Sequence, residues 1–185
     1  MEGRYITKEI AYTGEELRSH WAFRTFDILG DSMVAFQGPC HVAVDRMVDL
    51  ADVKADAPIR SERMLHFILE HFGGDLEKAV LRQRLLVSMI GESLTRTGVN
   101  RPLVRRGDDL FQGDGKLSVS IAAKTPVSCM IHLGLNVLSQ GTPVPTVGLA
   151  DMGIDPEDLA RKVIDQYVEE MEQIGEAQCK VRGVL

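Results

Sequence analysis

The segment from residue 105 to residue 137 constrains the fold more than any other part of the sequence. It contains three short runs in which apolar and polar residues alternate, separated by a Gly-Asp-Gly turn and by a second loop. Alternation with a period of two residues is typical of β-strands, and glycine-rich turns commonly join neighbouring strands. The pattern therefore predicts three strands, the last of which ends at Asn136.

One lysine, Lys116, stands between the glycine turn and the strand that follows it. A turn at the start of a strand brings an ammonium group to one edge of a sheet, where it can bind a phosphate or stabilise a developing oxyanion. Most lysines lie on protein surfaces, so a solvated turn lysine fits the same spacing. The residues alone leave both interpretations open.

This segment resembles the lysine-bearing hairpin of the superfamily that joins biotin protein ligases, lipoate-protein ligases and octanoyl transferases. The matching residues are Asp108-Asp109-Leu110, Gly115-Lys116-Leu117-Ser118 and Gly134-Leu135-Asn136-Val137. His132 falls where octanoyl transferases have the histidine of their His-Gly-Phe-Ala-Leu-Asn-Val run. The resemblance implies that Lys116 binds a carboxylate, an acyl carbonyl or an α-phosphate, with Asp109, His132 and Asn136 beside it.

A second block of sequence carries the same resemblance. Residues 37–43, which read Gln-Gly-Pro-Cys-His-Val-Ala, are similar to the octanoyl transferase stretch His-Gly-Pro-Gly-Gln-Leu-Val. The two blocks occur in the same order, and the similarity covers roughly Asp31–Ile174. It implies that residues 37–41 form one wall of the cleft, with Gln37, Gly38 and His41 at the substrate. The overall pattern also resembles a family known as a domain of unknown function.

The resemblance implies one α+β domain over residues 1–185. In this fold a mixed sheet packs with helices, as in biotin and lipoate ligases and, more distantly, class II aminoacyl-tRNA synthetases. Strands near both ends of the chain with helices between them fit the same layered arrangement. The expected ligand is a small carboxylate or acyl group, and the expected reaction class is acyl transfer.

The chemistry of that transfer remains open between two routes. The acyl-accepting cysteine of octanoyl transferases has no counterpart near Val144–Gly153. Cys40 lies beside Gly38-Pro39, on a loop that we expect to be exposed, and it could form a thioester if His41, His132 or Lys116 lowered its pKa. The other route proceeds through an adenylate. A non-catalytic binding or regulatory protein on the same fold is the alternative.

Composition excludes several classes of partner. A formal net charge of -6 argues against nucleic acid, because phosphate binding usually requires a basic face. Three scattered cysteines argue against a disulfide framework and favour a reducing cytoplasm, and no apolar run approaches the roughly 20 residues of a membrane span. Metal-ligand pairs such as Cys-x-x-Cys are missing, so no metal is expected. The sequence specifies no cofactor, and it is compatible with a homodimer.

Local signals predict the remaining elements. Capping residues and apolar spacing predict helices over Leu17–Thr25, Glu62–Phe72, Leu76–Leu94 and from Pro156 to Gly175. Alternation predicts further strands over Arg4–Tyr12, Ser32–Phe36, His41–Val48 and Lys180–Leu185. Gly38-Pro39 is expected to form the turn between the second and third of these strands.

Overall fold

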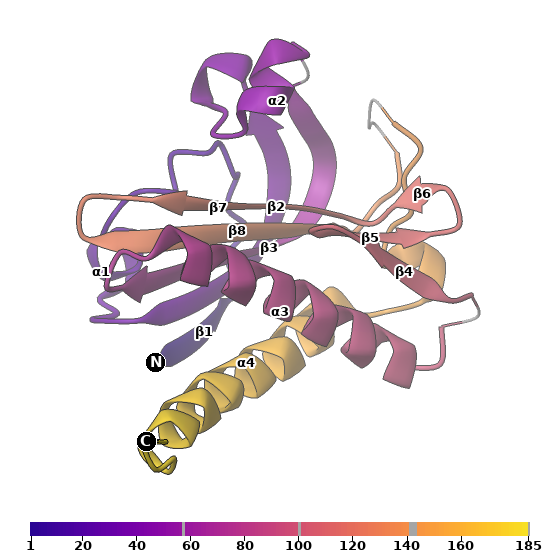
Figure 1. Cartoon of the computed structure of the whole chain (residues 1–185). Helices are drawn as coiled ribbons and strands as arrows, with labels where there is room; N and C mark the ends of the chain where they lie inside the picture. The colour runs from indigo at the N-terminus through magenta and orange to yellow at the C-terminus, as the bar shows by residue number, and fades with distance from the viewer. Residues whose placement is uncertain (57, 100, 141–143, 185) are drawn as a thin grey trace.

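The computed structural model describes residues 1–56, 58–99, 101–140 and 144–184. Its centre is a five-stranded sheet in the order β1-β2-β3-β8-β7 (Figure 1). The first pair of strands is parallel and the other three pairs are antiparallel. The predicted mixed sheet packed with helices is therefore confirmed. The strands are β1 (Glu2–Ile6), β2 (Ser32–Val42), β3 (Ile59–Phe72), β7 (Ser118–Lys124) and β8 (Ser128–Asn136).

A small second sheet joins the large one beside Lys116. It has the order β4-β5-β6 and is built from Leu103–Arg106, Asp109–Gln112 and Gly115–Lys116. The three strands predicted between residues 103 and 137 are thus five strands in two sheets. Leu117 connects β6 directly to β7, so the chain passes from the small sheet into the large one next to the lysine.

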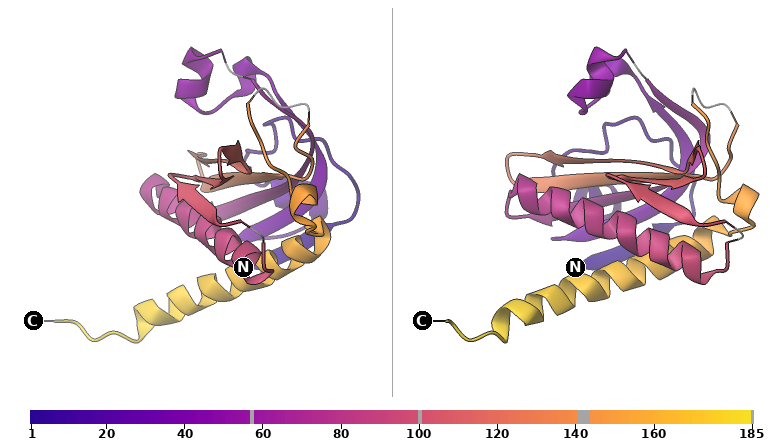
Figure 2. Two further views of the ribbon diagram at one scale, coloured as in Figure 1. Left: turned by 90° about the vertical axis from the view of Figure 1, so that its right-hand side faces the viewer. Right: turned by 45° about the vertical axis from the view of Figure 1, so that its right-hand side comes forward.

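Two long helices, α3 (Leu76–Arg96) and α4 (Pro156–Cys179), cover one face of the large sheet (Figure 1). Each begins at an aspartate whose carboxylate accepts a backbone N–H of the first turn: Asp75 from Lys78 and Asp155 from Asp158. These caps satisfy N–H groups that have no partner within the helix. Gly175 does not end α4 as predicted, and the helix extends beyond the sheet (Figure 2).

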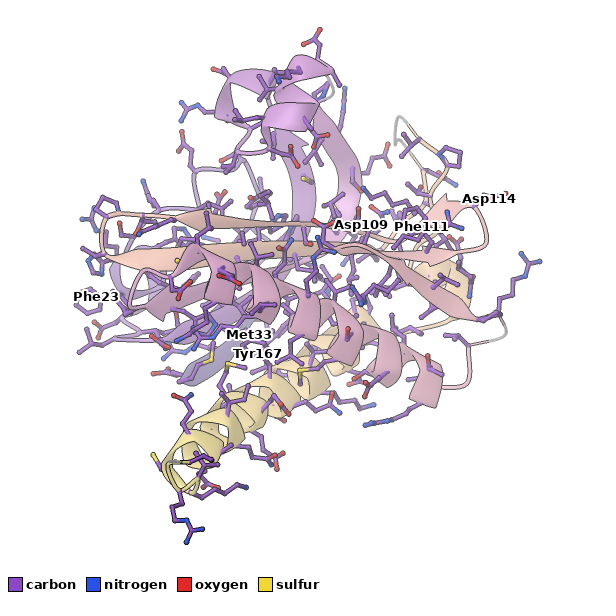
Figure 3. All side chains as sticks on the ribbon, in the orientation of Figure 1. Phe23, Met33, Asp109, Phe111, Asp114 and Tyr167 are labelled. Carbon is purple, nitrogen blue, oxygen red and sulfur yellow. The ribbon has the colours of Figure 1, made fainter. Side chains whose placement is uncertain are left out.

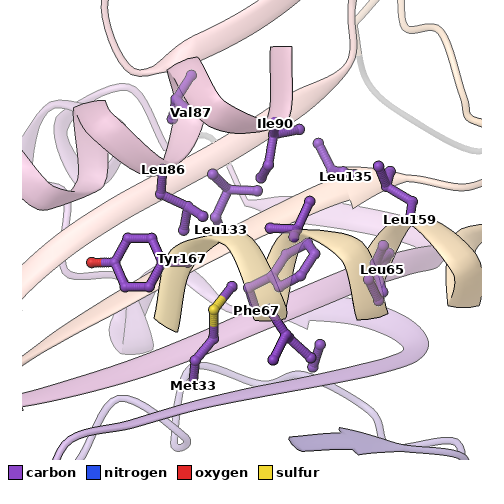
Figure 4. Packing of buried hydrophobic residues seen from close by; sticks show 14 of the residues in the cluster. Met33, Leu65, Phe67, Leu86, Val87, Ile90, Leu133, Leu135, Leu159 and Tyr167 are labelled. Carbon is purple, nitrogen blue, oxygen red and sulfur yellow. The ribbon is translucent and has the colours of Figure 1, made fainter. Parts of the chain in front are cut away.

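The main hydrophobic core lies between these helices and the sheet (Figure 4). Leu65 and Phe67 of β3 and Leu133 and Leu135 of β8 are fully buried there. Burial of a side chain of this size stabilises the fold by roughly 1.5 to 3 kcal/mol. The helices contribute Leu86, Val87, Ile90, Leu159 and Tyr167.

The opposite face of the sheet is covered differently. The segment between β1 and β2, which includes α1 (Trp21–Phe26), packs a smaller apolar cluster against Val34, Phe36 and Ile68. The connection from β2 to β3 contains the short helices η1 (Val44–Arg46) and α2 (Leu50–Lys54), which project above the sheet (Figure 1). This cover is incomplete, and a cavity remains beside it.

The helix predicted over Glu62–Phe72 is wrong, because this segment is most of strand β3. Its residues from Met64 to His71 are buried without interruption. A strand with both faces covered loses the alternation of apolar and polar residues that identifies a half-exposed strand. Apolar residues that do not alternate with polar ones therefore resembled the buried side of a helix.

The turn predicted at Gly38-Pro39 is also wrong, because β2 continues through these residues with an irregularity between Gly38 and Cys40. A Cβ atom on Gly38 would lie 1.9 Å from the carbonyl oxygen of Ile10. The glycine thus permits a close approach of two backbones, and the proline occupies a bulge, where no ladder hydrogen bond is needed.

Both ends of the chain differ from the prediction. The first strand ends at Ile6, and the chain from Ile10 to Tyr12 instead donates backbone hydrogen bonds to the carbonyl groups of Gln37 and Pro39. The first helix is shorter and later than Leu17–Thr25. No strand forms over the described residues 180–184. Among the described residues, no helix combines the length and the hydropathy that a membrane span requires.

Candidate functional site

Lys116 lies at a cavity of about 320 Å³ on the face of the sheet opposite to α3 and α4. Its Nζ is 2.7 Å from Oδ2 of Asp109, which precedes it across the β5–β6 hairpin. We call this space the Lys116 cavity. Its lining includes Tyr12, Val42, Ser61, Met64, Asp109, Lys116, Val119, His132 and Asn136.

Asp109 is held by two groups. Besides the Lys116 ammonium, the Ser118 hydroxyl donates to Oδ1 at 3.3 Å and itself accepts the backbone N–H of Leu110 at 2.8 Å. Burial raises the pKa of the Asp109 carboxyl, while the hydrogen bond from Lys116 opposes that shift. The charge of the Lys116 ammonium is therefore partly compensated by Asp109, and about two-thirds of the lysine side chain is shielded from water.

Asn136 holds the lysine backbone in place. Its Nδ2 donates to the Lys116 carbonyl at 3.1 Å, and its backbone N–H donates to the Leu117 carbonyl at 2.9 Å. The Lys116 N–H donates to the carbonyl of Pro145. The end of β8 and the segment after it thus fix the direction in which the β6 lysine leaves the sheet.

His132, four residues before Asn136 on β8, belongs to a buried aromatic stack. The rings of Tyr12 and His132 have centroids 3.7 Å apart, and Tyr12 also stacks on His66 at 5.2 Å. Nδ1 of His66 is 3.1 Å from Nε2 of His132. Burial lowers the pKa of His66 to about 4, and burial together with His66 holds the pKa of His132 well below its usual range. Both imidazoles are neutral at neutral pH.

Ser61 lines the cavity and carries an enclosed hydroxyl group. Ser61 is 3% exposed, and its hydroxyl has no hydrogen-bond partner among the described residues. Desolvation of an unpartnered hydroxyl costs free energy, and such groups in native structures commonly await a ligand or a water. Met64, three residues farther along β3, pairs with Asn136, and both Ser61 and Met64 line the Lys116 cavity.

The structure brings four of the predicted site residues together: Asp109, Lys116, His132 and Asn136 all line the Lys116 cavity. Residues 37–41, which were expected to form one wall, are not among the lining residues; these include Val42 of the same strand and Tyr12 from the segment that runs beside it. Gln37 donates to the Tyr5 hydroxyl at 2.9 Å, and Tyr5 packs on the main core beside the helices. His41 is exposed on β2 and is not part of the lining.

Gly38 reaches the site only through its carbonyl group, which lies 3.2 Å from Nε2 of His66. Cys40 does not lie on an exposed loop as expected. It is 1% exposed within β2, opposite Ser61. Burial, with a smaller contribution from Glu16, raises the pKa of its thiol to about 12. A thiol with this pKa is not a nucleophile at neutral pH, because the thiolate is the reactive form.

Three residues of the site were absent from the sequence-based prediction. Tyr12 reaches the cavity because residues 10–12 follow the irregular part of β2, and nothing in the local sequence indicates that path. His66 and Ser61 lie on β3, where the incorrect helix assigned them to a different surface. A strand assignment over Ile59–Phe72 would have placed His66 beside β8.

A larger cavity of about 530 Å³ lies between the end of α3 and the start of α4. Its lining includes Arg101, Lys162, Asp151 and Asp155. The two aspartates already accept backbone N–H groups, from Gly148 and Asp158. None of the predicted site residues lines this cavity. Within the described ranges, no cluster of three or more His, Cys, Asp or Glu side chains has the geometry of a metal site.

Comparison with known sequences and structures identifies relatives of this chain. A family model described as "Domain of unknown function (DUF366)" matches residues 1–182. An uncharacterized protein of Methanocaldococcus jannaschii is 43% identical over 177 residues, covering 92% of this chain and 79% of that protein. A solved protein of unknown function from Pyrococcus horikoshi superposes with a TM-score of 0.93 at 41% identity, covering 99% of this chain and 100% of that chain.

More distant structures share the fold. The biotin protein ligase of Aquifex aeolicus superposes with a TM-score of 0.63 at 14% identity, over 95% of this chain and 72% of the ligase. The same ligase in complex with biotin and ATP gives 0.59 at 12% identity, over 95% and 72%. A T. acidophilum protein described as a candidate lipoate protein ligase, with bound lipoic acid, gives 0.59 at 15% identity, over 94% and 87%. At these identities the similarity establishes the fold alone.

Proposed function

The chain belongs to the DUF366 family, and we propose that its Lys116 cavity binds a small carboxylic acid or acyl group and that the protein acts in acyl transfer. The observation that carries the proposal is the shielded Lys116 ammonium at a cavity that also contains an unpartnered buried hydroxyl. The fold shared with proteins described as biotin and lipoate ligases supports it.

In the proposed complex, Lys116 donates to a carboxylate or carbonyl oxygen of the ligand. Ser61 lines the same cavity; its hydroxyl is enclosed in the ligand-free protein and supplies a second donor once its side chain turns toward the ligand. Asp109 directs the ammonium group, and a ligand oxygen then shares it with Asp109. The acyl chain lies against apolar side chains that include Val42, Met64 and Val119. A largely apolar pocket with a few directed polar groups is typical of small-molecule sites.

For the transfer itself we favour an adenylate route over a thioester on Cys40. In the first step a carboxylate oxygen attacks the α-phosphorus of a nucleoside triphosphate, and pyrophosphate leaves. In the second step an acceptor attacks the acyl carbon, and the nucleotide monophosphate leaves. Lys116 stabilises the negative charge that grows on the oxygens in both steps. Cys40 is disfavoured because its thiol is buried and its pKa is raised to about 12.

A non-catalytic binding protein is the second candidate. The observation that favours it is the sequence before β2, which reads Gly30-Asp31-Ser32, whereas the resemblance to ligases and octanoyl transferases implies consecutive glycines there. The Asp31 carboxylate is engaged in the structure, since it accepts the backbone N–H of Phe72 and pairs with His71. In this case Lys116 and Ser61 hold a ligand that undergoes no reaction.

Binding can be tested with octanoic acid, lipoic acid and biotin as probes. We expect at least one of them to raise the melting temperature of the protein and to give a measurable affinity by calorimetry. Lys116→Met removes the ammonium and keeps an unbranched stem, so it should abolish that binding. Lys78→Met is the matched control, because Lys78 is an exposed lysine on α3. If none of the probes binds, or if Lys116→Met binds as wild type does, the proposal is wrong.

Catalysis is tested separately from binding. With ATP, magnesium and the bound acid, an adenylate route releases pyrophosphate, and hydroxylamine traps the activated acyl group as a hydroxamate. A binding protein releases none. A Cys40 thioester would instead appear as an acyl mass on the protein that neutral hydroxylamine removes and that Cys40→Ser abolishes. We expect no such adduct.

A further inference from the structure

The hydrogen bonds of His66 determine which of its ring nitrogens carries the proton. Nε2 of His66 lies 3.2 Å from the Gly38 carbonyl oxygen, and a carbonyl oxygen only accepts. Nε2 must therefore carry a hydrogen. Burial lowers the pKa of His66 to about 4, so at neutral pH the ring carries one proton and its Nδ1 is a bare acceptor.

The same reasoning extends to His132. Nδ1 of His66 is 3.1 Å from Nε2 of His132, and a bare Nδ1 requires a donor at that distance. Nε2 of His132 is therefore protonated. Since burial and the neighbouring ring keep His132 neutral, its Nδ1 is bare. If Nδ1 of His66 carried the proton instead, the lone pair of its Nε2 would face the lone pairs of the Gly38 carbonyl oxygen.

The bare Nδ1 of His132 is open to the Lys116 cavity. His132 lines this cavity, and its Nδ1 has no hydrogen-bond partner in the part of the chain that the structure describes. That atom is also not among the fully enclosed polar atoms that lack a partner. The Tyr12 ring, stacked on the imidazole at 3.7 Å, fixes the plane in which the lone pair points. The cavity therefore presents a directed hydrogen-bond acceptor.

We propose that the ligand of the Lys116 cavity is bifunctional: it carries a carboxylate or acyl oxygen for Lys116 and, at its other end, a hydrogen-bond donor for Nδ1 of His132. The donor is a hydroxyl, an amine or an amide N–H. A ligand with an ester or ketone oxygen at this end is rejected, because two acceptors would face each other. This inference rests on the proposed function, since it takes the carboxylate end from it.

The strand register shows that the two groups contact different parts of the cavity. Asn136, whose side chain holds the Lys116 carbonyl, is four residues from His132 on β8, so the Cα atoms of these two residues are about 13 Å apart. Acids with an extended chain of roughly eight to ten carbons are therefore suitable probes of a ligand that contacts both Lys116 and His132. His132 acts in recognition and not as a base, because an imidazole with so low a pKa takes up a proton poorly at neutral pH.

The tautomer is tested by long-range proton–nitrogen NMR on the ligand-free protein. We expect His132 and His66 both to show a protonated Nε2 and an unprotonated Nδ1 at pH 7. The protein has five histidines, and the signals of His132 are assigned by their loss in His132→Phe. A protonated Nδ1 on His132 would overturn the inference without affecting the proposed function.

The ligand class is tested with matched acids that differ only at the far end. 8-Hydroxyoctanoic acid and 8-methoxyoctanoic acid carry the same carboxylate, but only the first has a donor. We expect the hydroxy acid to bind wild type about tenfold more tightly, the effect of one hydrogen bond at a buried acceptor. In His132→Phe this preference should disappear, whereas Lys116→Met should weaken both acids alike.

The outcomes separate the two proposals. If both acids bind wild type equally, the bifunctional ligand is wrong and the carboxylate site stands. If neither binds, although the ten-carbon pair is also tried, this inference is wrong, and the proposed function fails with it only if octanoic acid, lipoic acid and biotin do not bind either. Because the two acids are compared on the wild-type protein, the result of this test does not depend on whether His132→Phe folds.

Discussion

Alternate residues of strand β8 serve two different surfaces. Leu133 and Leu135 point to α3 and α4 and are fully buried in an apolar core, whereas His132 and Asn136 line the Lys116 cavity. The same division occurs on β3, where Phe67 belongs to the helix side and His66 to the other. Figure 3 shows Met33 and Tyr167 on the side of the sheet where α4 lies, with Asp109 farther up, near β5.

Substitutions on the two faces of the sheet should have different effects. On the helix side, the core residues are mostly apolar and are held by packing, so a loss of side-chain volume should lower stability. On the cavity side, the polar groups satisfy one another in a chain from Gly38 through His66 to His132, and in a second group around Lys116 and Asp109. The acceptor at His132 and the hydroxyl of Ser61 remain for a ligand. Stability and binding should therefore respond to different substitutions.

The largest effect is expected on the helix side. Leu133→Ala should lower the free energy of unfolding by about 3 to 5 kcal/mol, because the leucine is 0% exposed among tightly packed neighbours. The matched control is Leu29→Ala, which makes the same change at a leucine that is 80% exposed and should alter stability by less than about 0.5 kcal/mol. Denaturant unfolding measures both. A loss below about 1 kcal/mol at Leu133 would contradict the division between the faces.

A pH titration of stability reports on the cavity side. The pKa of His66 is lowered to about 4 in the folded protein, so between pH 6.5 and 4 the unfolded chain binds a proton that the native state does not. As the pH is lowered from 6.5 to 4, the free energy of unfolding should therefore decrease by about 3 kcal/mol because of His66 alone. His132 adds a contribution of the same sign, and Asp109, whose pKa is raised, one of opposite sign.

The measurement is a series of denaturant unfolding curves at pH 4 to 7. Asp31 does not interfere in the upper part of the window. Its pKa is lowered in the native state by its hydrogen bonds to His71 and Phe72, so its contribution is lost only as the pH falls below the usual range of carboxyl groups. A flat profile between pH 6.5 and 5 would show that the two histidines are charged or solvated.

The Lys116–Asp109 pair should separate stability from binding. Lys116→Met leaves a largely buried carboxylate without its cation, which should lower the free energy of unfolding by about 1 kcal/mol. The double variant Lys116→Met/Asp109→Asn removes both charges and should recover most of that loss. Neither variant should bind a carboxylic acid. Recovery of binding together with stability would mean that the pair is only structural.

Sequence patterns predicted the structural features that depend on residues close together in the chain. The aspartate caps of α3 and α4 and the position of His132 and Asn136 on one face of β8 follow from local spacing. The proximity of Asp109 and Lys116, which the resemblance implied, is found in the structure across the β5–β6 hairpin. The functional roles of these four residues remain predictions.

Long-range packing explains what the sequence did not predict. Strand β3 is buried on both faces, so its composition lost the strand signal, and His66 and Ser61 were lost with it. Tyr12 reaches the cavity only because the backbone of Ile10 contacts Gly38 at an irregularity of β2. The buried position of Cys40 has the same origin, since it pairs with Tyr12 on one side and Ser61 on the other.

The smallest effect on stability is expected at Ser61, and it gives the sharpest contrast with binding. Ser61→Ala removes a buried hydroxyl that has no partner among the described residues, so the free energy of unfolding should change by less than about 0.5 kcal/mol or increase slightly. Ser32→Ala is a close control, because the Ser32 hydroxyl is equally buried and unpartnered but does not line the Lys116 cavity. Both variants should unfold like wild type in denaturant. By calorimetry, only Ser61→Ala should bind the carboxylic acid probes more weakly. Equal binding by the two variants would remove Ser61 from the site and leave Lys116 as the sole donor to the ligand oxygen.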